Sequence, residues 1–311
     1  MKKIKILFII IFLMIFSACG TPHMEELTYN NEKPNYIKTD ELILEERYAP
    51  SDFVCIGDKI IATDSKNDCL LIIDKDFKKI EAIGETGNGD NEYINPRGIQ
   101  YFDGMFYVMD SGNSRIKIID SNFEYEDEIN LKEIVFNDPS SFLDDLAIDD
   151  NGNIFFTVNA KFCRKDGKLY CIENISNEIK VLMNNCTGIV SAYNNKIYFT
   201  NTVEYIKNRS ASGRHYIYEI ENREIMSLYH LPDDYTPVSI YVNDSGVYCL
   251  SMGYSEISKT NIEERQVNTL FSEPPDFNDS KDKEYAAMSI DDEIIYLLEN
   301  VSNVIYKLEP R

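Results

Sequence analysis

Tryptophan is absent from the 311-residue sequence, and histidine occurs only at positions 23, 215 and 230. The first absence removes an aromatic side chain that often stacks on sugar rings. The scarcity of histidine excludes most histidine-ligated metal sites. It also leaves only His215 and His230 for a Ser–His–Asp arrangement, and no nucleophile-elbow motif accompanies them. The sequence therefore contains no recognisable catalytic constellation.

Positive charge is scarce as well, because 31 Lys and Arg stand against 53 Asp and Glu, a formal net charge of −22. Such a surface repels a phosphate backbone, so we expect no nucleic-acid partner. Hydrophobic residues nevertheless make up 43% of the chain. This share is enough for a sizeable core and too high for a disordered protein.

Cysteines with the C-x-x-C spacing of redox sites are missing. Cys55, Cys171 and Cys249 lie within predicted strands, where a cysteine usually acts as a small buried hydrophobe. We therefore expect free thiols, with one optional disulfide whose connectivity the spacing does not fix. The cysteines after position 19 are Cys55, Cys69, Cys163, Cys171, Cys186 and Cys249.

The sequence also lacks an apolar run of membrane-spanning length. Ile6–Phe16 is apolar but has only eleven residues, too few to cross a bilayer as a helix. It follows Lys2, Lys3 and Lys5. A positive segment followed by a short apolar one is typical of a signal peptide, which we expect over residues 1–18.

Small residues stand at the two positions before Cys19, in the sequence Phe16-Ser17-Ala18-Cys19. This tetrapeptide resembles the lipobox of bacterial lipoproteins. The resemblance implies a lipidated Cys19 that holds the protein on a membrane, and Gly20 favours delivery to the outer membrane of the cell envelope. The polar residues 19–40 are expected to form the lipidated cysteine and a flexible tether.

Internal repetition is the strongest pattern in the rest of the chain. Residues 61–74, 107–120 and 296–309 read IATDSKNDCLLIID, YVMDSGNSRIKIID and YLLENVSNVIYKLE. Each copy joins two strand-like runs through a short polar turn. The repeat recurs six times with a mean period of 47 residues. Its equivalent positions are Ile60, Phe106, Ile154, Ile197, Val247 and Ile295.

A period near 47 that contains only short strands and turns is typical of a four-stranded propeller blade. Six periods predict an all-β, six-bladed β-propeller of antiparallel blades over residues 41–311. The sixth unit has only three strands, whereas Glu41–Glu46 has the composition of a fourth. We expect this N-terminal strand to pair with the last blade, because that pairing removes an exposed edge and closes the ring.

The second repeat resembles the NHL repeat, in which Pro-x-Gly-Ile leads to Tyr-Val-x-Asp-x-x-Asn-x-Arg-Ile. Asp110 and Asn113 are expected to hold its tight turn by hydrogen bonds. The whole chain is similar to the six-bladed propeller lipoproteins of the NHL-repeat or TolB-like type found in Bacteroidota. The matching residues are Pro96, Gly98, Ile99, Tyr107, Val108, Asp110, Asn113, Arg115 and Ile116.

Long loops are predicted on one face of the propeller, where recognition sites usually lie. We expect Arg97 and Asp144 to meet at the inner rim of this face and to orient a polar ligand. The long loops are residues 84–98, 130–145, 158–167, 200–216, 229–238, 251–256 and 271–286.

The 200–216 loop carries Tyr205, Arg209 and Arg214, a basic patch on an acidic protein. This patch is either a site for a carboxylate, sulfate or acidic partner loop, or a solvated loop. Tyr254 is a candidate aromatic face for a glycan or peptide. Further candidate aromatic faces are Tyr93, Tyr235 and Tyr285.

The sequence favours a non-catalytic module that binds a glycan, peptide or protein at the cell envelope, without a cofactor. The alternative is a carboxylate-metal-dependent hydrolase or lyase that resembles the gluconolactonase propellers. That enzyme would hold calcium between at least three tunnel carboxylates. A third possibility, a structural scaffold, predicts a tunnel filled with apolar side chains.

Overall fold

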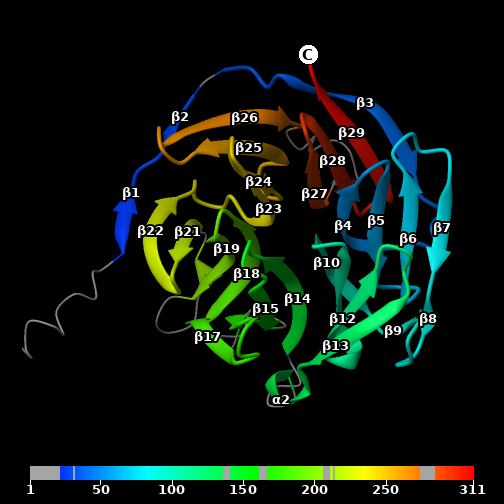
Figure 1. Ribbon diagram of the computed structural model, residues 1–311. Helices are drawn as coiled ribbons and strands as arrows, with labels where there is room; N and C mark the ends of the chain where they lie inside the picture. Colours follow the sequence, from blue (N-terminus) through cyan, green and yellow to red (C-terminus); the bar gives the residue numbers. More distant parts are fainter. Residues whose placement is uncertain are drawn as a thin grey trace, which may run out of the picture.

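The chain forms a closed ring of six β-sheets around a central axis (Figure 1). The predicted six-bladed propeller is therefore confirmed. The computed structural model describes residues 22–30, 32–135, 141–160, 167–205, 211–212, 214–273 and 284–311, without the side chains of 160, 203–205 and 211–212.

Each blade is an antiparallel sheet whose first strand lies at the axis and whose fourth lies outside. Blades 1 to 3 are β4 (Pro50–Ile56), β5 (Lys59–Asp64), β6 (Cys69–Asp74) and β7 (Ile80–Ile83); β10 (Pro96–Phe102), β11 (Met105–Asp110), β12 (Arg115–Asp120) and β13 (Tyr125–Asn130); and β14 (Ser141–Ile148), β15 (Ile154–Ala160), β16 (Lys168–Ile172) and β17 (Ile179–Asn184).

The second half of the ring repeats this order. Blades 4 to 6 are β18 (Cys186–Tyr193), β19 (Lys196–Tyr205), β21 (Tyr216–Glu221) and β22 (Glu224–His230); β23 (Pro237–Asn243), β24 (Gly246–Ser251), β25 (Glu256–Asn261) and β26 (Gln266–Ser272); and β27 (Tyr285–Asp291), β28 (Ile294–Glu299), β29 (Val304–Pro310) and β3 (Tyr36–Ile43). The minor elements are β8 (Glu85–Thr86), β9 (Glu92–Tyr93), η1 (Ser111–Asn113), α2 (Lys132–Val135) and β20 (Ala211–Ser212).

The ring closes between the first and last parts of the domain, as predicted. Strand β3 pairs antiparallel with β29, with Leu42 opposite Ile305. The strand starts at Tyr36, earlier than expected, and Leu44 beyond it is buried in the core between blades 6 and 1. This main-chain pairing covers the outer edge of β29 and joins the start of the propeller to its end.

Much of the stretch expected to be a flexible tether is instead β-structure. Strands β1 (His23–Glu25) and β2 (Thr28–Tyr29) pair in parallel with β22 and β26. They add an outer strand to blades 4 and 5, because their backbone groups satisfy the free edges of those sheets. We refer to residues 22–43, apart from residue 31, as the strap.

Hydrophobic side chains fill the spaces between neighbouring blades. Among the described residues, six buried clusters each join two adjacent blades around the ring. For example, Ile61 and Leu70 of blade 1 pack with Phe106 and Val108 of blade 2. The apolar side chains on the two sides of a blade therefore pack against the two neighbouring blades, and there is no single central core.

The two faces of the ring differ in their connections. The first and second strands of blades 1, 2, 4, 5 and 6 are joined by two-residue turns on what we call the short-turn face. The opposite, long-loop face carries the longer described links, such as 84–95 and 231–236. Asn185 alone joins β17 to β18 there, so the loop length expected on this face is unevenly distributed.

The Asp–Asn turns and the cysteines follow their predictions in the described part of the chain. Asp64 accepts hydrogen bonds from the backbone N–H and the side-chain amide of Asn67, and the side-chain amide of Asn113 donates to Asp110 over 2.8 Å. The free thiols are Cys55, Cys69, Cys171, Cys186 and Cys249, whereas Cys163 and Cys19 lie outside the described residues. No described helix has the length and apolar character to cross a membrane.

Candidate functional site

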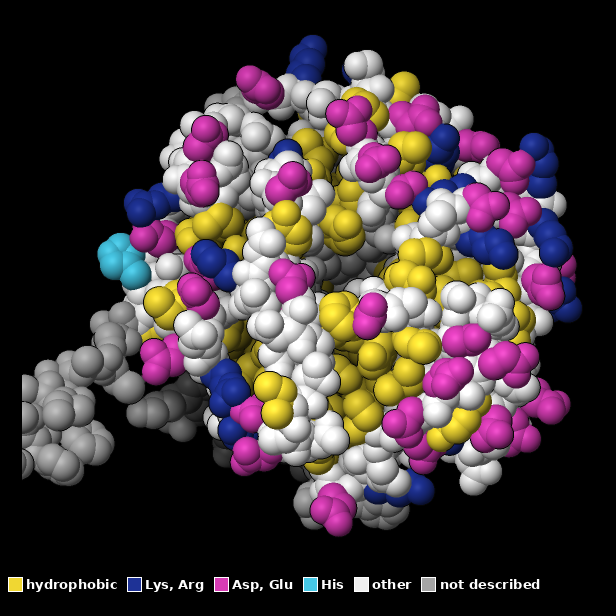
Figure 2. All heavy atoms as spheres, in the orientation of Figure 1, with side chains coloured by type: hydrophobic (Ala, Val, Ile, Leu, Met, Phe, Trp, Pro, Cys, Tyr) yellow, Lys and Arg dark blue, Asp and Glu magenta, His cyan; other side chains and the backbone are white. Residues whose placement is uncertain are grey.

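A cavity of about 440 Å³ occupies the axis of the ring, where Figure 2 shows a central hollow. Its wall is built by the first strand of every blade: β4, β10, β14, β18, β23 and β27. A volume of this size accommodates a small ligand or the end of a larger one. The tunnel is therefore not filled with apolar side chains, the feature expected of a pure scaffold.

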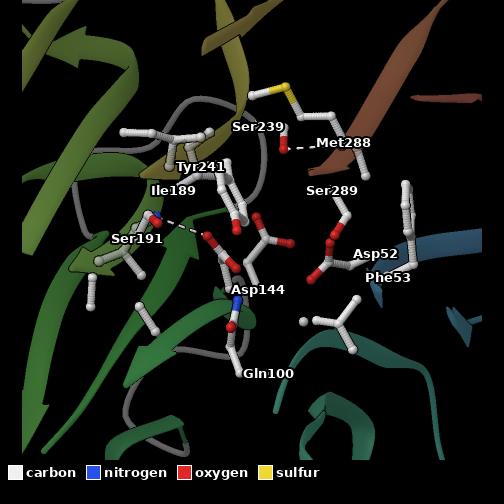
Figure 3. A pocket seen from close by; sticks show the side chains of 18 of the residues that line it. Asp52, Phe53, Gln100, Asp144, Ile189, Ser191, Ser239, Tyr241, Met288 and Ser289 are labelled. Carbon is white, nitrogen blue, oxygen red and sulfur yellow. Dashed lines mark hydrogen bonds between the residues drawn. The ribbon is translucent and has the colours of Figure 1, made fainter. Parts of the chain in front are cut away.

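The two halves of this wall differ in chemistry (Figure 3). Blades 1 to 3 contribute charged side chains, whereas blades 4 to 6 contribute hydroxyl and apolar groups. The charged residues are Asp52, Arg97, Asp144 and Asp145; opposite them lie Ile189, Ser191, Ser239, Tyr241, Met288 and Ser289.

Arg97 and Asp144 lie side by side in the wall. The guanidinium Nη1 of Arg97 is 3.0 Å from Oδ1 of Asp144, and the other oxygen of Asp144 accepts a hydrogen bond from Asn159 over 2.6 Å. The Arg97 guanidinium also stacks on the Phe142 ring at 4.4 Å, and its buried Nε has no hydrogen-bond partner. The pair is thus oriented from several sides, while its role in ligand binding stays a prediction.

Two further carboxyl groups in the wall occupy matching positions in blades 1 and 3. Asp52 accepts a hydrogen bond from the backbone N–H of Ile99 in blade 2 over 3.1 Å. Asp145 accepts one from Val190 in blade 4 over 2.8 Å. The backbone N–H of each aspartate donates to a threonine of its own second strand, Thr63 and Thr157 respectively.

Blade 5 has a neutral version of the same contact. Ser239 accepts a hydrogen bond from the backbone N–H of Met288 in blade 6 over 3.2 Å (Figure 3). Side chains of blades 1, 3 and 5 therefore link the innermost strands of successive blades. The carboxylates of Asp52 and Asp145 do this while also facing the cavity.

Burial shifts the protonation of both carboxyl groups. Desolvation is the main reason that the pKa of Asp52 rises to about 7, and the nearby charge of Asp144 adds to this effect. Desolvation and the charge of Asp52 raise the pKa of Asp145 well above its ordinary value. An ionised carboxylate is costly in such a site, so these groups favour protonation or a cationic neighbour.

Asp52 and Asp145 were not among the predicted site residues. The overlooked pattern is an aspartate at the register shift of the first strand and a threonine in the second strand that accepts its N–H, found in blades 1 and 3.

Residues 49–273 match the family described as 6-bladed beta-propeller. The chain belongs to this family. The match covers well over half of the propeller and agrees with the six sheets of the structure. Among curated proteins, none matches this sequence.

Solved propellers with similar structures include enzymes. Virginiamycin B lyase from Staphylococcus aureus has a TM-score of 0.60 at 16% identity, over 89% of this chain and 100% of that chain. A streptogramin B lyase has a TM-score of 0.60 at 13% identity, over 89% of this chain and 98% of that chain. A luciferin-regenerating enzyme has a TM-score of 0.62 at 14% identity, over 89% of this chain and 95% of that chain. At these identities the likeness shows the fold alone.

The predicted basic patch of the 200–216 loop is only partly described. Arg209 lies outside the described residues, and of Tyr205 only the backbone in β19 is described. Arg214 is exposed and does not line the propeller cavity. Of the three residues of the basic patch, only Arg214 can be placed relative to the cavity, and it lies outside the wall that holds Arg97 and Asp144.

The predicted aromatic faces are mostly buried. Tyr93, Tyr235 and Tyr285 are at most 2% exposed, because their rings fill the spaces between blades, and their prediction as ligand platforms was wrong. Tyr254 is 42% exposed, and its hydroxyl donates to the carbonyl of Asp233 over 3.0 Å. It lies on the long-loop face but outside the cavity wall.

The carboxylates of the wall do not form a metal site. Within the described ranges, no group of three or more His, Cys, Asp or Glu side chains is placed to hold a metal ion. The calcium of the enzymatic alternative therefore has no set of ligands in this part of the propeller. The four charged residues can instead bind polar groups directly, through hydrogen bonds and charge pairing.

Proposed function

We propose that the protein is a lipid-anchored binding module of the bacterial cell envelope, held through Cys19 on the outer membrane. Its central cavity receives a polar group of a glycan, peptide or protein partner. The observation that carries this proposal is the charged wall formed by Asp52, Arg97, Asp144 and Asp145 inside a cavity of about 440 Å³.

The charges of this wall favour a ligand with a cationic or donor-rich group. The wall contains three carboxyl groups and one guanidinium, and desolvation raises the pKa of two of the carboxyl groups, Asp52 and Asp145. A ligand ammonium would compensate that desolvation, whereas a ligand carboxylate would meet like charges. An amino sugar or a peptide amine is thus the class of ligand that the site suits best.

Binding of this kind is testable by calorimetry on the protein purified from membranes in detergent. Glucosamine and glucose are matched probes, because they differ by an amine in place of a hydroxyl. We expect glucosamine to bind about tenfold more tightly or better, and we expect Asp52→Asn to remove this preference. Asp127→Asn, on the exposed strand β13, is the matched control and should keep it.

Equal binding of the two sugars, or a preference that survives in Asp52→Asn, would contradict the proposed ligand class. The anchor is tested separately by metabolic labelling with palmitate. We expect label in the native protein and none in Cys19→Ala. Density fractionation of the membranes then tests the outer-membrane location.

A catalytic function is a second candidate, favoured by one observation. The carboxyl of Asp52 has a pKa of about 7 and lies close enough to Asp145 for their charges to interact. Such a pair can donate and accept protons near neutral pH without a metal. Turnover of a lactone such as gluconolactone that disappears in Asp52→Asn would favour an enzyme over a binding module.

A further inference from the structure

The strap determines where the N-terminal segment meets the propeller. Strand β1 runs parallel to β22, and His23 lies opposite Ser227. Strand β22 begins after the turn at 222–223 on the short-turn face and runs toward the long-loop face. Because β1 runs in the same direction, its first residue, His23, is at the end of β1 nearer the short-turn face of blade 4.

The proposed lipid is close to that point. Cys19 is four positions before His23, and an extended chain spans at most about 3.6 Å per residue, so Cys19 can lie at most about 14 Å away. A lipid on Cys19 therefore cannot leave the propeller free to tumble at a distance. It must hold the outer edge of blade 4 near the membrane surface.

Apolar side chains are exposed at this same edge. Ile175, in the turn between β16 and β17 of blade 3, is 100% exposed. Met24 of β1 and Met226 of β22 are 56% and 47% exposed. We call Met24, Ile175 and Met226 the apolar corner.

An ion pair joins the two blades at the apolar corner. Glu173, which begins the turn that carries Ile175, pairs with Arg223 in the turn before β22. The same carboxylate is 2.7 Å from Nζ of Lys180. The negative charge of Glu173 is thus compensated locally, which lowers its cost next to a lipid surface.

From these observations, and building on the proposed lipid anchor, we infer that the propeller rests on the membrane through the apolar corner of blades 3 and 4. The short-turn face then lies toward the lipid and the long-loop face away from it. Exposed apolar residues next to a covalent lipid add a second membrane contact to the first.

This orientation has a consequence for the candidate site. Asp52 and Arg97 lie near the starts of β4 and β10, at the ends of those strands that meet the long-loop face, whereas Asp145 and Asp144, the partner of Arg97, lie in the middle of β14. The charged end of the cavity therefore opens away from the membrane. Its ligand would arrive from the aqueous side and would not need to be a component of the same bilayer.

The absence of tryptophan makes the orientation directly measurable. A single Ile175→Trp variant, purified as the lipidated full chain and reconstituted in phosphatidylcholine vesicles, supplies the only tryptophan fluorescence. We expect brominated acyl chains to quench it about twofold or more, since the side chain reaches the headgroup–acyl boundary. Val301→Trp is the matched control, because Val301 is 50% exposed in the β28–β29 turn on the long-loop face.

Equal quenching of both variants, or quenching of Val301→Trp alone, would overturn the orientation. Met226→Trp is a second probe of the apolar corner, and its fluorescence should be quenched as strongly as that of Ile175→Trp. It tests the orientation if Ile175→Trp folds poorly. Palmitate labelling separates the two proposals. Lipidated protein without quenching at the apolar corner refutes the orientation alone, whereas an unlipidated Cys19 refutes the anchor and the orientation together.

Discussion

Asp52 combines a structural contact with a shifted protonation equilibrium. Its carboxylate accepts the Ile99 N–H of the next blade, while burial raises its pKa to about 7. Because this value exceeds the ordinary pKa of an aspartate in the unfolded chain, the folded state binds the proton more tightly. The stability of the propeller should therefore fall as the pH rises from about 4 to about 7.

Asp52→Asn keeps an acceptor for Ile99 and removes the titration. We expect the variant to gain thermal stability relative to the native protein at pH 8 and to lose that advantage at pH 5. Thermal unfolding at the two pH values measures this difference. The exposed Asp127→Asn variant should have the thermal stability of the native protein at both pH values. If Asp52→Asn were more stable than the native protein by the same amount at both pH values, the raised pKa of Asp52 would be contradicted.

Lys117 shows how one buried cation organises the Gly-rich loop of the NHL-like repeat. Its Nζ donates to the carbonyls of Gly89, Asp90 and Glu92 and lies 4.1 Å from the centre of the Tyr93 ring. The residue is 0% exposed. The carbonyl groups of this glycine-rich loop therefore bind a lysine of the blade that follows it.

Lys117→Met should lower the free energy of unfolding by about 1–3 kcal/mol, because the substitution removes three hydrogen bonds from a buried ammonium and leaves only Arg115 as a side-chain donor to the carbonyls of Gly89 and Glu92. Denaturant unfolding measures the change. Lys78→Met is the control, since Lys78 forms only an exposed pair with Asp76 and should change stability by about 0.5 kcal/mol or less. If Lys117→Met left the free energy of unfolding unchanged, the loop would not depend on this ammonium.

At the scale of elements, the strap protects the outer edges of half the ring. It supplies the fourth strand of blade 6 and outer strands for blades 5 and 4. Strand β13 of blade 2 stays at an edge and carries Glu126, Asp127 and Glu128, charges that discourage pairing with another chain. The ring thus uses both coverage and charge to avoid association through its edges.

The last residue of the strap, Ile43, and the residue that follows it, Leu44, test how the end of the strap is held to the core. Leu44 is 2% exposed and packs between blades 6 and 1, whereas Ile43 is 68% exposed. Leu44→Ala should cost about 2–5 kcal/mol of unfolding free energy, and Ile43→Ala about 0.5 kcal/mol or less. Similar costs for both substitutions in denaturant unfolding would mean that the strap closes the ring by backbone pairing alone.

At the scale of the whole molecule, net charge dominates. The chain has 31 Lys and Arg against 53 Asp and Glu, a formal net charge of −22. Acidic side chains are scattered over the face shown in Figure 2. Such self-repulsion destabilises a compact chain, and salt weakens it by shortening the screening length from about 30 Å at 0.01 M to about 10 Å at 0.1 M.

We therefore expect the melting temperature at pH 8 to rise by a few degrees between about 0.01 M and 0.15 M NaCl. The gain should nearly vanish at pH 5, close to the sequence pI of about 4.5, where the net charge is small. Thermal unfolding across the four conditions tests this. A salt effect of equal size at both pH values would point to a specific ion instead.

Much of the fold could be predicted from the sequence because the repeat is local. Alternating apolar residues and turn residues recur in every blade, so equivalents such as Ile60, Ile154 and Ile295 all fall in second strands of the structure. Strands β1 and β2 could not be predicted, since two or three residues carry no periodicity. Their pairing depends on the edges that blades 4 and 5 present after folding.

The sequence by itself determined the number of blades, the closing strand and the acidic surface, because hydrophobic alternation, turn chemistry and net charge are properties of local residues and composition. Only the tertiary structure decided which side chains meet at the axis. Asp52 and Asp145 belong to distant repeats and face one cavity because the ring curves back on itself. Their shifted pKa values follow from that shared burial, which no local pattern records.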